Sequence, residues 1–339
     1  MCLGVALALL LAAPALCAEP EPATTGATAV PAERQPAQPN PPATFGPPAP
    51  PPVTHKPKYA LVLPLDSPAF ARAAQAVKAG FIAASDVAGE KPMVLSFSHA
   101  EGGVVQAYAE AAASGAKIVV GPLARDDLKR LLAAAPSFVP TLALNQPDEG
   151  DALPRDVYAF GLAIESEARQ IAQQMRSAGL QRVAIVADTA PLQRRLQSAF
   201  KEAWERLGGK LAGLYPYFSE PGAIRATRSE IDKTDADCLF LALDSDQARQ
   251  VRAYLSTRPA YASSLVYDGA QSFGYRELNN VRLAEMPWLA QPDHAAVMTY
   301  PRANLGDVSL ERLYALGIDA FRLAHQFAAS ASARSPRSG

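Results

Sequence analysis

Few residues of this chain have the types and spacing that catalysis requires. The sequence contains no Gly-x-Ser-x-Gly nucleophile motif, no Gly-x-Gly-x-x-Gly dinucleotide motif and no Walker phosphate loop. Gly208-Gly-Lys210 lacks the spacing of such a loop and its Ser or Thr. The four histidines are dispersed, so no pair has the spacing of a helical metal site. The sequence therefore predicts a protein that is not an enzyme and that needs no cofactor or metal.

The individual histidines and acidic pairs suit structural roles better than catalytic ones. His325 lies in a predicted helix, where we expect packing or surface exposure. His99 follows a predicted strand, where a ligand contact is the alternative to a structural role. Asp126 and Asp127 begin a predicted helix, whose dipole favours carboxylates at that end. Asp244-Ser-Asp246 follows a strand and is expected to cap the next helix, with a ligand contact as the alternative.

Short apolar strands alternate with amphipathic helices from residue 58 onwards. One strand ends at Gly121-Pro122 and a helix follows at once, which is typical of an open parallel sheet whose ligand crevices lie beyond the carboxyl ends of the strands. The helix expected at 68–86 places Phe70, Ala74, Val77, Phe81 and Ala84 on one face. In this first series we predict strands at 59–65, 93–97, 117–121 and 141–144, and helices at 68–86, 104–114 and 124–135.

A second series of the same kind follows a helix that ends at Gly179. Two series of about 100 residues each predict an α/β protein with two lobes, each a parallel sheet flanked by helices. We place the first lobe at about 58–160 and 285–327 and the second at about 161–284, with a disordered tail at 328–339. In the second series and after it we predict strands at 182–187, 211–218, 238–243 and 264–267, and helices at 192–207, from Asp246, and at 310–327.

A ligand held between two such lobes would contact the loops at the strand ends. An amino-acid ligand would need a carboxylate for its ammonium group, for which Asp244 and Asp268 are candidates, and amides or hydroxyls for its carboxylate. The candidate ligand-binding residues are Asp66, Ser67, Ser98, Gly121, Asn145, Thr189, Asp244, Ser245 and Asp268.

The N-terminus has the features of an export signal at 1–18. Residues 3–16 are almost continuously apolar, too few to span a bilayer, and small residues surround Cys17. Two alternatives remain: lipidation of Cys17, as in a lipoprotein, or plain cleavage beside Cys17 or Ala18. We expect a periplasmic protein, with an outer-membrane lipid anchor as one form and no other contact with a membrane.

Residues 19–57 form a predicted disordered linker rich in proline and alanine. Such a segment buries too little apolar surface to offset the entropy of ordering it. In extended polyproline conformations it would reach at most roughly 120 Å. It is either an inert spacer or, if Cys17 is lipidated, a tether.

Charge and cysteine content exclude several classes of protein. The net charge is −1, from 32 basic and 33 acidic residues, which gives no footprint for nucleic acid. The three cysteines are Cys2, Cys17 and Cys238, so a disulfide framework and a cysteine-rich zinc site are excluded. Cys238 begins an apolar run and is predicted to be a buried structural thiol.

Several short segments resemble a known family. Leu61-Val-Leu-Pro-Leu65, Val77-Lys-Ala-Gly-Phe81 and Ile118-Val-Val-Gly-Pro-Leu123 are similar to segments of type I periplasmic binding proteins. Three further segments resemble the LppC family of penicillin-binding-protein activators over residues 58–327. These are Tyr158-Ala-Phe-Gly-Leu162 with Glu165-Ser-Glu-Ala168, Met286-Pro-Trp-Leu289, and Arg312-Leu-Tyr-Ala-Leu-Gly-Ile-Asp-Ala-Phe321.

The resemblance implies a type I periplasmic-binding-protein fold and a non-catalytic, exported regulator of peptidoglycan synthesis. Its expected partner is a peptidoglycan synthase, a bifunctional penicillin-binding protein, which it would activate by direct contact. The alternative is a periplasmic solute-binding or sensing protein for a small amino-acid-like ligand in the cleft between the lobes. Such proteins close their lobes around the ligand.

Overall fold

The computed structural model describes residues 57–100, 102–134, 139–147, 152–255, 257–269 and 276–334. The predicted export signal with Cys17, and the predicted linker up to residue 56, lie outside these ranges. Within them, no helix combines the length and the apolar character that crossing a bilayer requires.

The first sheet has five parallel strands in the order β2-β1-β3-β4-β5. The neighbouring strands β1 and β3 are apolar at every position because helices cover both faces of the sheet. The strands are β1 (Tyr59–Leu63), β2 (Met93–Ser96), β3 (Ile118–Val120), β4 (Thr141–Ala143) and β5 (Val157–Ala159).

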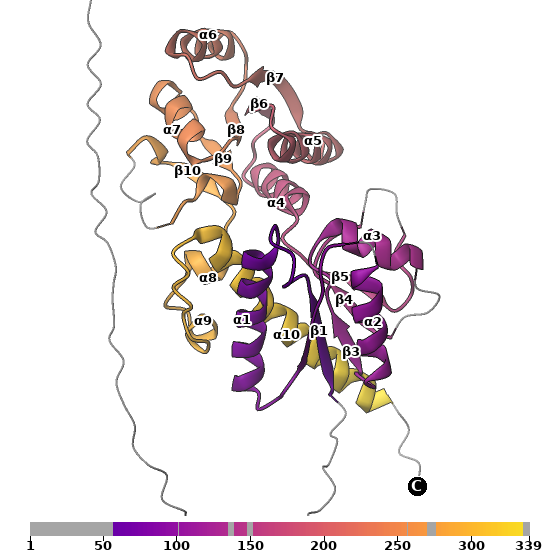
Figure 1. Cartoon of the computed structure of the whole chain (residues 1–339). Coiled ribbons are helices and arrows are strands. Elements are labelled where there is room, and N and C mark those ends of the chain that lie inside the picture. Colours follow the sequence, from indigo (N-terminus) through magenta and orange to yellow (C-terminus); the bar gives the residue numbers. More distant parts are fainter. Residues whose placement is uncertain are drawn as a thin grey trace, which may run out of the picture. The chain divides into compact units, whose positions relative to one another are not determined.

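Alternate residues of β1 enter two separate cores. Leu61 and Leu63 pack with α1 (Ala71–Val87) and the C-terminal helix α10 (Val308–Arg334). Ala60 and Val62 pack on the opposite face, against α2 (Gly103–Ala113) and α3 (Arg125–Ala134). Figure 1 shows α1 and α10 on one side of this sheet and α2 and α3 on the other. The first lobe is therefore a helix–sheet–helix sandwich.

The second sheet repeats this plan in the order β10-β9-β8-β6-β7. Counted from its own first strand, β6, this is the same order as in the first sheet, so both lobes have one topology. The strands are β6 (Arg182–Ala187), β7 (Lys210–Pro216), β8 (Cys238–Ala242), β9 (Ala260–Ala262) and β10 (Val281–Leu283).

Helices cover both faces of the second sheet as well. Val183 and Ile185 of β6 pack with α4 (Ile164–Ser177) and α5 (Pro191–Arg206). The other face packs with α6 (Pro221–Asp232) and α7 (Ser245–Tyr254). The remaining short elements are the 3-10 turns η1 (Ser264–Val266) and η3 (Arg276–Leu278), and the helices α8 (Pro287–Ala290) and α9 (Ala295–Met298). The α/β fold class with two flanked parallel sheets is thus confirmed.

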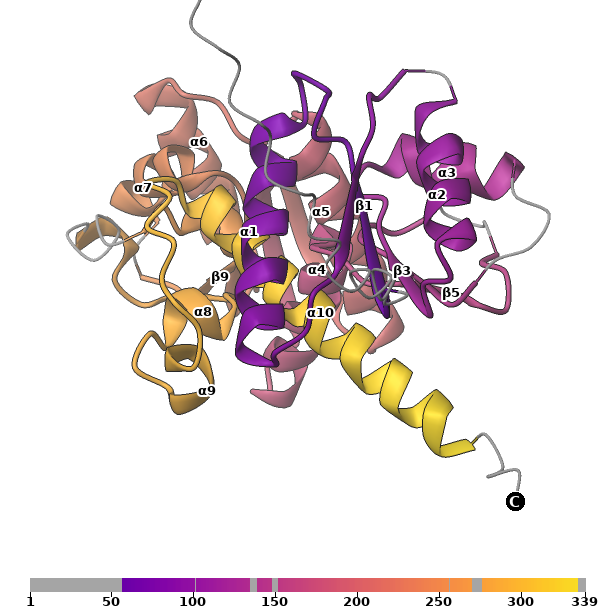
Figure 2. The same ribbon diagram turned by 60° about the horizontal axis from the view of Figure 1, so that its bottom comes forward.

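The helices α1 and α10 pack unusually closely, and Figure 2 shows them crossing. A β-carbon at Gly80 would lie 1.9 Å from the carbonyl oxygen of Tyr314, and one at Gly317 would lie 2.1 Å from that of Val77. No side chain fits at such distances, so a glycine on each helix is what permits the contact. This interface joins the two ends of the described chain, because α10 completes a core that β1 begins.

Several predicted boundaries differ from the structure. The helix predicted at 310–327 extends to Arg334, so the first residues of the predicted disordered tail are helical. The strand predicted at 264–267 is wrong: the strand lies at Ala260–Ala262, and Ser263 then caps the 3-10 turn, its Oγ accepting from the Leu265 N–H at 3.3 Å. Four of the five residues predicted for the α1 face, Ala74, Val77, Phe81 and Ala84, are buried in the helix, but α1 begins at Ala71, so Phe70 precedes it and is half-buried.

Cys238 is a free, fully buried thiol in β8, as predicted. Burial raises its pKa, so the reactive thiolate is disfavoured at neutral pH. In a chain with Cys2→Ser and Cys17→Ser, we therefore expect Ellman's reagent to label Cys238 only after the protein is unfolded in guanidinium. Rapid labelling of the native chain would contradict this burial.

Candidate functional site

The candidate residues of the first sheet follow the carboxyl ends of its strands. Gly121 follows β3 at φ +115°, and a β-carbon there would lie 2.1 Å from the Val62 carbonyl oxygen. Its N–H donates to the Leu142 carbonyl at 2.9 Å. Gly121 is thus needed for the close approach of β3 to β1, a sufficient reason for glycine without any ligand.

The other candidate residues after the strands of the first sheet are either exposed to solvent, or buried or hydrogen-bonded within the protein. Asp66 and Ser98 are exposed, and the Asp66 N–H donates to the Phe97 carbonyl, which joins the loops after β1 and β2. Ser67 is buried. Asn145 is engaged through both side-chain groups: its Nδ2 donates to the Leu123 carbonyl at 2.9 Å, and its Oδ1 accepts from the Gln146 N–H.

The second sheet brings its candidates together in short hydrogen-bond chains. Asp244 caps α7 in a capping box: its Oδ1 accepts from the Gln247 N–H at 2.9 Å, and the Gln247 side chain accepts from the Asp244 N–H. The predicted capping role is therefore confirmed. The Ser245 hydroxyl donates to Asp268 Oδ2 at 2.9 Å. Thr189 is exposed beside Asp188, whose Oδ2 accepts from Gln247 Nε2.

His99 contacts a buried carboxylate. Its Nδ1 lies 2.8 Å from Asp127 Oδ1, and Arg130 Nη1 lies 3.1 Å from the same oxygen. Asp126 and Asp127 do lie in the first turn of α3, as predicted, but Asp127 is buried and thus also anchors the loop after β2. His325 is exposed and its Nδ1 lies 3.1 Å from the Tyr59 hydroxyl, which agrees with the predicted packing or surface role.

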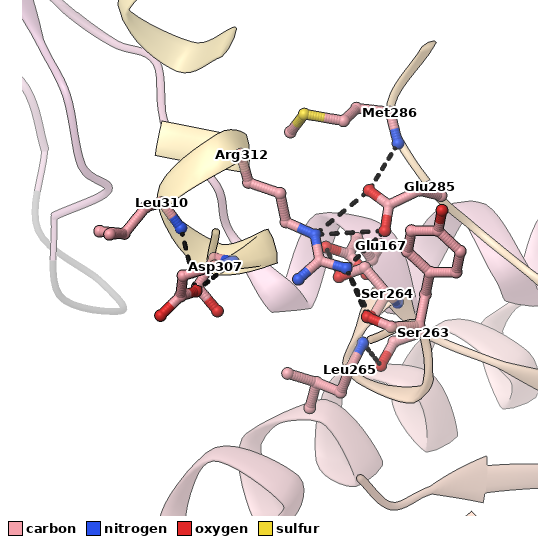
Figure 3. Close-up of polar contacts among 11 residues, drawn as sticks. Glu167, Ser263, Ser264, Leu265, Glu285, Met286, Asp307, Leu310 and Arg312 are labelled. Atoms are coloured by element: carbon pink, nitrogen blue, oxygen red, sulfur yellow. Dashed lines mark hydrogen bonds and ion pairs between the residues drawn. The ribbon is translucent and has the colours of Figure 1, made fainter. Parts of the chain in front are cut away.

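A buried polar cluster lies where the chain passes between the two sheets (Figure 3). Arg312, near the start of α10, forms an ion pair with Glu285 at 2.5 Å, and their side chains are only 12% and 3% exposed. The same guanidinium donates to the carbonyl oxygens of Ser264 and Tyr267 at 2.9 and 3.0 Å. Glu285 follows β10, so this pair ties α10 of the first lobe to the end of the second sheet.

Glu167 extends this cluster from α4. Its two carboxylate oxygens accept from the N–H and the hydroxyl of Ser264, each at 2.9 Å. Burial raises the pKa of Glu167, and the charge of Glu285 acts in the same direction. The Ser264 hydrogen bonds and the charge of Arg312 oppose both. The net effect is a carboxyl that holds its proton more tightly in the folded protein than in the unfolded chain.

The raised pKa of Glu167 predicts a specific pH dependence. The protonated Glu167 contributes fully to stability at a pH below its ordinary pKa of 4.5. This contribution is lost as the pH rises through the raised pKa of the folded protein. A Glu167→Gln variant retains one acceptor and one donor for Ser264 and cannot ionise. We expect its stability to rise relative to the natural chain between about pH 4 and about pH 7, measured by urea unfolding.

Glu165 on the same helix is the matched control. Burial tends to raise its pKa, but hydrogen bonds from its own N–H and from Arg195 outweigh that and lower it. The stabilising contribution of Glu165 is present above the ordinary pKa of 4.5 and is lost as pH falls through the lowered pKa. Glu165→Gln should therefore lose stability relative to the natural chain as pH rises through the acid range to about 5, with no further change above it. If the stability of both variants relative to the natural chain changed in the same direction with pH, the opposite pKa shifts of Glu167 and Glu165 would be wrong.

Sequence reasoning did not select the residues of this cluster as a site. Glu167 and Arg312 lie inside the segments that carry the family resemblance, and Glu285 directly precedes another. The family resemblance of those segments is thus the feature of the sequence that could have pointed to this cluster. Within the described ranges, no group of three or more His, Cys, Asp and Glu side chains is arranged to hold a metal ion. The polar groups here hold chain segments together.

Comparison with known proteins identifies relatives over the whole two-sheet region. The model of the family described as "LppC putative lipoprotein" matches residues 52–331. The penicillin-binding protein activator LpoA of Pasteurella multocida is 28% identical and aligns with 80% of this chain. That of Enterobacter sp. is 27% identical and aligns with 66%. The alignments cover 47% and 37% of those relatives, so this chain spans less than half of their length.

Solved structures show the same fold. A protein from Chromobacterium violaceum called a "putative branched-chain amino acid ABC transporter" is 33% identical, with a TM-score of 0.69 over 84% of this chain and 91% of that one. The C-domain of Haemophilus influenzae LpoA, called a regulator of PBP1A, is 24% identical, with a TM-score of 0.67 over 83% and 88%. At 24% identity, the similarity to the Haemophilus influenzae C-domain shows a shared fold only. The match of the family model to most of the chain shows that this protein belongs to the LppC family.

Proposed function

We propose that this protein is a non-catalytic activator that contacts a peptidoglycan synthase of the penicillin-binding-protein class. The observation that carries the proposal is the LppC family match over residues 52–331, with relatives that are named penicillin-binding protein activators. The matched region contains both sheets and all but the last three residues of α10, so it covers both lobes.

The geometry of the strand ends supports a protein regulator over a solute carrier. Asp244, Ser245 and Asn145 are engaged in caps and turns. The buried Arg312–Glu285 pair ties the start of α10 to the segment after β10. A solute carrier closes its lobes around its ligand, whereas docking of a partner on the outer surface needs no such closure.

The proposed location is the periplasm, with Cys17 as the lipid acceptor of an outer-membrane anchor. Residues 19–57 would then be the tether that lets the folded region reach a synthase at the inner membrane. A tether raises the effective concentration of a partner only if it spans the gap. Mass spectrometry of the mature N-terminus distinguishes a lipidated Cys17 from plain cleavage.

A binding experiment tests the proposal. The full chain is immobilised, and a purified bifunctional penicillin-binding protein from the same cell is passed over it, with a monofunctional transpeptidase as the control. We expect saturable binding of the bifunctional synthase only. Equal binding of both proteins, or of neither, would contradict the proposal.

The second candidate function is solute binding, favoured by the 33% identical Chromobacterium violaceum structure. In that case Asp66, Ser98 and Thr189, whose side chains are exposed, would be the first ligand contacts, with Asp268 offering a carboxylate. A thermal-shift screen of the full chain against amino acids and muropeptides separates the two functions. A large upward shift would favour the solute-binding protein.

A further inference from the structure

The first lobe contains an apolar pocket of about 360 Å³, between α8, α9 and α10. Its volume is within the range of small-molecule sites, which is roughly 300–1,000 Å³. The pocket is separate from the strand-end loops that carry the candidate ligand residues. Its apolar lining includes Phe160, Leu162, Met286, Trp288, Val297 and Leu316.

Both segments that connect the two sheets line this pocket. Phe160 and Leu162 lie between β5 and α4, where the chain leaves the first sheet. Met286 lies between β10 and α8, where the chain returns. An occupant would therefore touch both connecting segments at once. Leu162 is 45% exposed, so the pocket presents a large apolar side chain to solvent.

The wall formed by Trp288 is held rigidly. Its indole Nε1 donates to Glu311 Oε2 at 2.9 Å, and the Arg302 guanidinium lies 4.0 Å from the ring centroid. Arg302 Nη1 also donates to the Trp288 carbonyl at 2.7 Å. Glu311 is fixed in turn by the Leu305 N–H at 2.7 Å. A preformed wall lowers the entropic cost of binding a ligand.

The polar groups of the pocket are mainly donors. His294 Nδ1 accepts from the Ala296 N–H at 3.2 Å, so the neutral ring carries its proton on Nε2, as a donor. Gln291 and Arg322 also line the pocket; the Gln291 amide can donate or accept, and the Arg322 guanidinium can only donate. The acidic group here, Asp319, is paired with Arg322 at 2.8 Å. This arrangement suits an acceptor on the ligand and disfavours an ammonium group.

We propose that this pocket binds a small lipophilic molecule with one carbonyl acceptor, and that the bound molecule restrains both connecting segments. The apolar chain or ring would lie against Trp288 and Leu316, and the carbonyl oxygen would face His294 and Gln291. The site is independent of the proposed activator function, because it makes no use of the synthase.

The test uses the full chain and two probes, octanamide and octylammonium, in ligand-detected NMR titrations. The probes share an eight-carbon chain, but only the amide has an acceptor. Ala296→Phe fills the pocket from an exposed position of α9, and Ala295→Phe is its matched control on the neighbouring residue outside the lining. We expect saturable octanamide binding that Ala296→Phe weakens at least tenfold and Ala295→Phe leaves unchanged.

A second pair of variants tests the same site without relying on the substitution at Ala296. Leu162→Asn changes an exposed residue of the pocket, and Leu192→Asn changes an exposed leucine of α5 outside it. Only the first should weaken octanamide binding. Absence of saturable binding, equal binding of octylammonium, or equal effects of the members of both pairs would overturn the proposed site.

Hydrogen exchange tests the restraint of the connecting segments. Octanamide should slow exchange at residues 160–163 and 284–286 in the natural chain and not in Ala296→Phe. Slower exchange confined to α9 and α10 would overturn the restraint while leaving the site itself intact.

Discussion

Replacing Gly80 by alanine is expected to lower the free energy of unfolding by about 3 kcal/mol, or to prevent folding altogether. The new methyl group would lie 1.9 Å from a backbone oxygen of α10, which cannot move away as a flexible side chain can. Helix propensity alone predicts the opposite sign, because alanine stabilises a helix interior by about 1 kcal/mol relative to glycine. Urea unfolding followed by circular dichroism measures the change.

Gly222 supplies the matched control for this substitution. It lies in α6, and a β-carbon added there would meet no atom within 4 Å beyond its chain neighbours and the adjacent backbone of its own helix. Gly222→Ala should therefore be neutral or stabilising by up to about 1 kcal/mol. If Gly80→Ala were as well tolerated as Gly222→Ala, the close contact between α1 and α10 would be wrong. The role of α10 in completing the first core would then need revision.

Replacing Arg312 by methionine is expected to cost about 3–5 kcal/mol, because it leaves the buried Glu285 carboxylate without its partner. The two carbonyl oxygens that the guanidinium binds would also lose a donor. Chemical denaturation measures the loss. The double variant Arg312→Met, Glu285→Leu should recover part of it, since no uncompensated charge then remains buried.

An exposed ion pair shows what the same substitution costs without burial. Lys201 and Glu205 lie 3.1 Å apart on α5, with side chains that are 42% and 47% exposed. Lys201→Met should change the stability by less than about 0.5 kcal/mol. If Arg312→Met lowered the free energy of unfolding as little as Lys201→Met does, the Arg312–Glu285 pair would contribute no more than a surface ion pair.

The strands β1 to β4 and β6 to β8 and most of the long helices were predictable because each carries its own local signal, whereas β5, β9, β10 and α6 were not predicted. Strands buried on both faces are continuously apolar, and the α1 face follows helical spacing. The cap at Asp244 was predictable for the same reason, since a strand end followed by Asp and a helix is a local pattern. The helices α8 and α9 each have four residues, too few to show a periodicity.

The polar cluster and the apolar pocket depend on contacts that sequence spacing does not reveal. Glu285 and Ser264 lie 27 and 48 positions from Arg312, and Ser264 lies 97 positions from Glu167. Only folding brings them together. Gly121 illustrates the converse: its place after a strand suggested a ligand contact, whereas the close approach of the Val62 backbone supplies the physical requirement.

The most direct test of the central claim is the rate at which a purified bifunctional penicillin-binding protein polymerises and cross-links lipid-linked peptidoglycan precursor. The rate is measured alone, with the full chain, and with the full chain after heat denaturation. We predict that the native chain stimulates the synthase saturably, that the denatured chain does not, and that the chain without synthase forms no product. A synthase rate unchanged by the native chain at saturating binding would contradict the account.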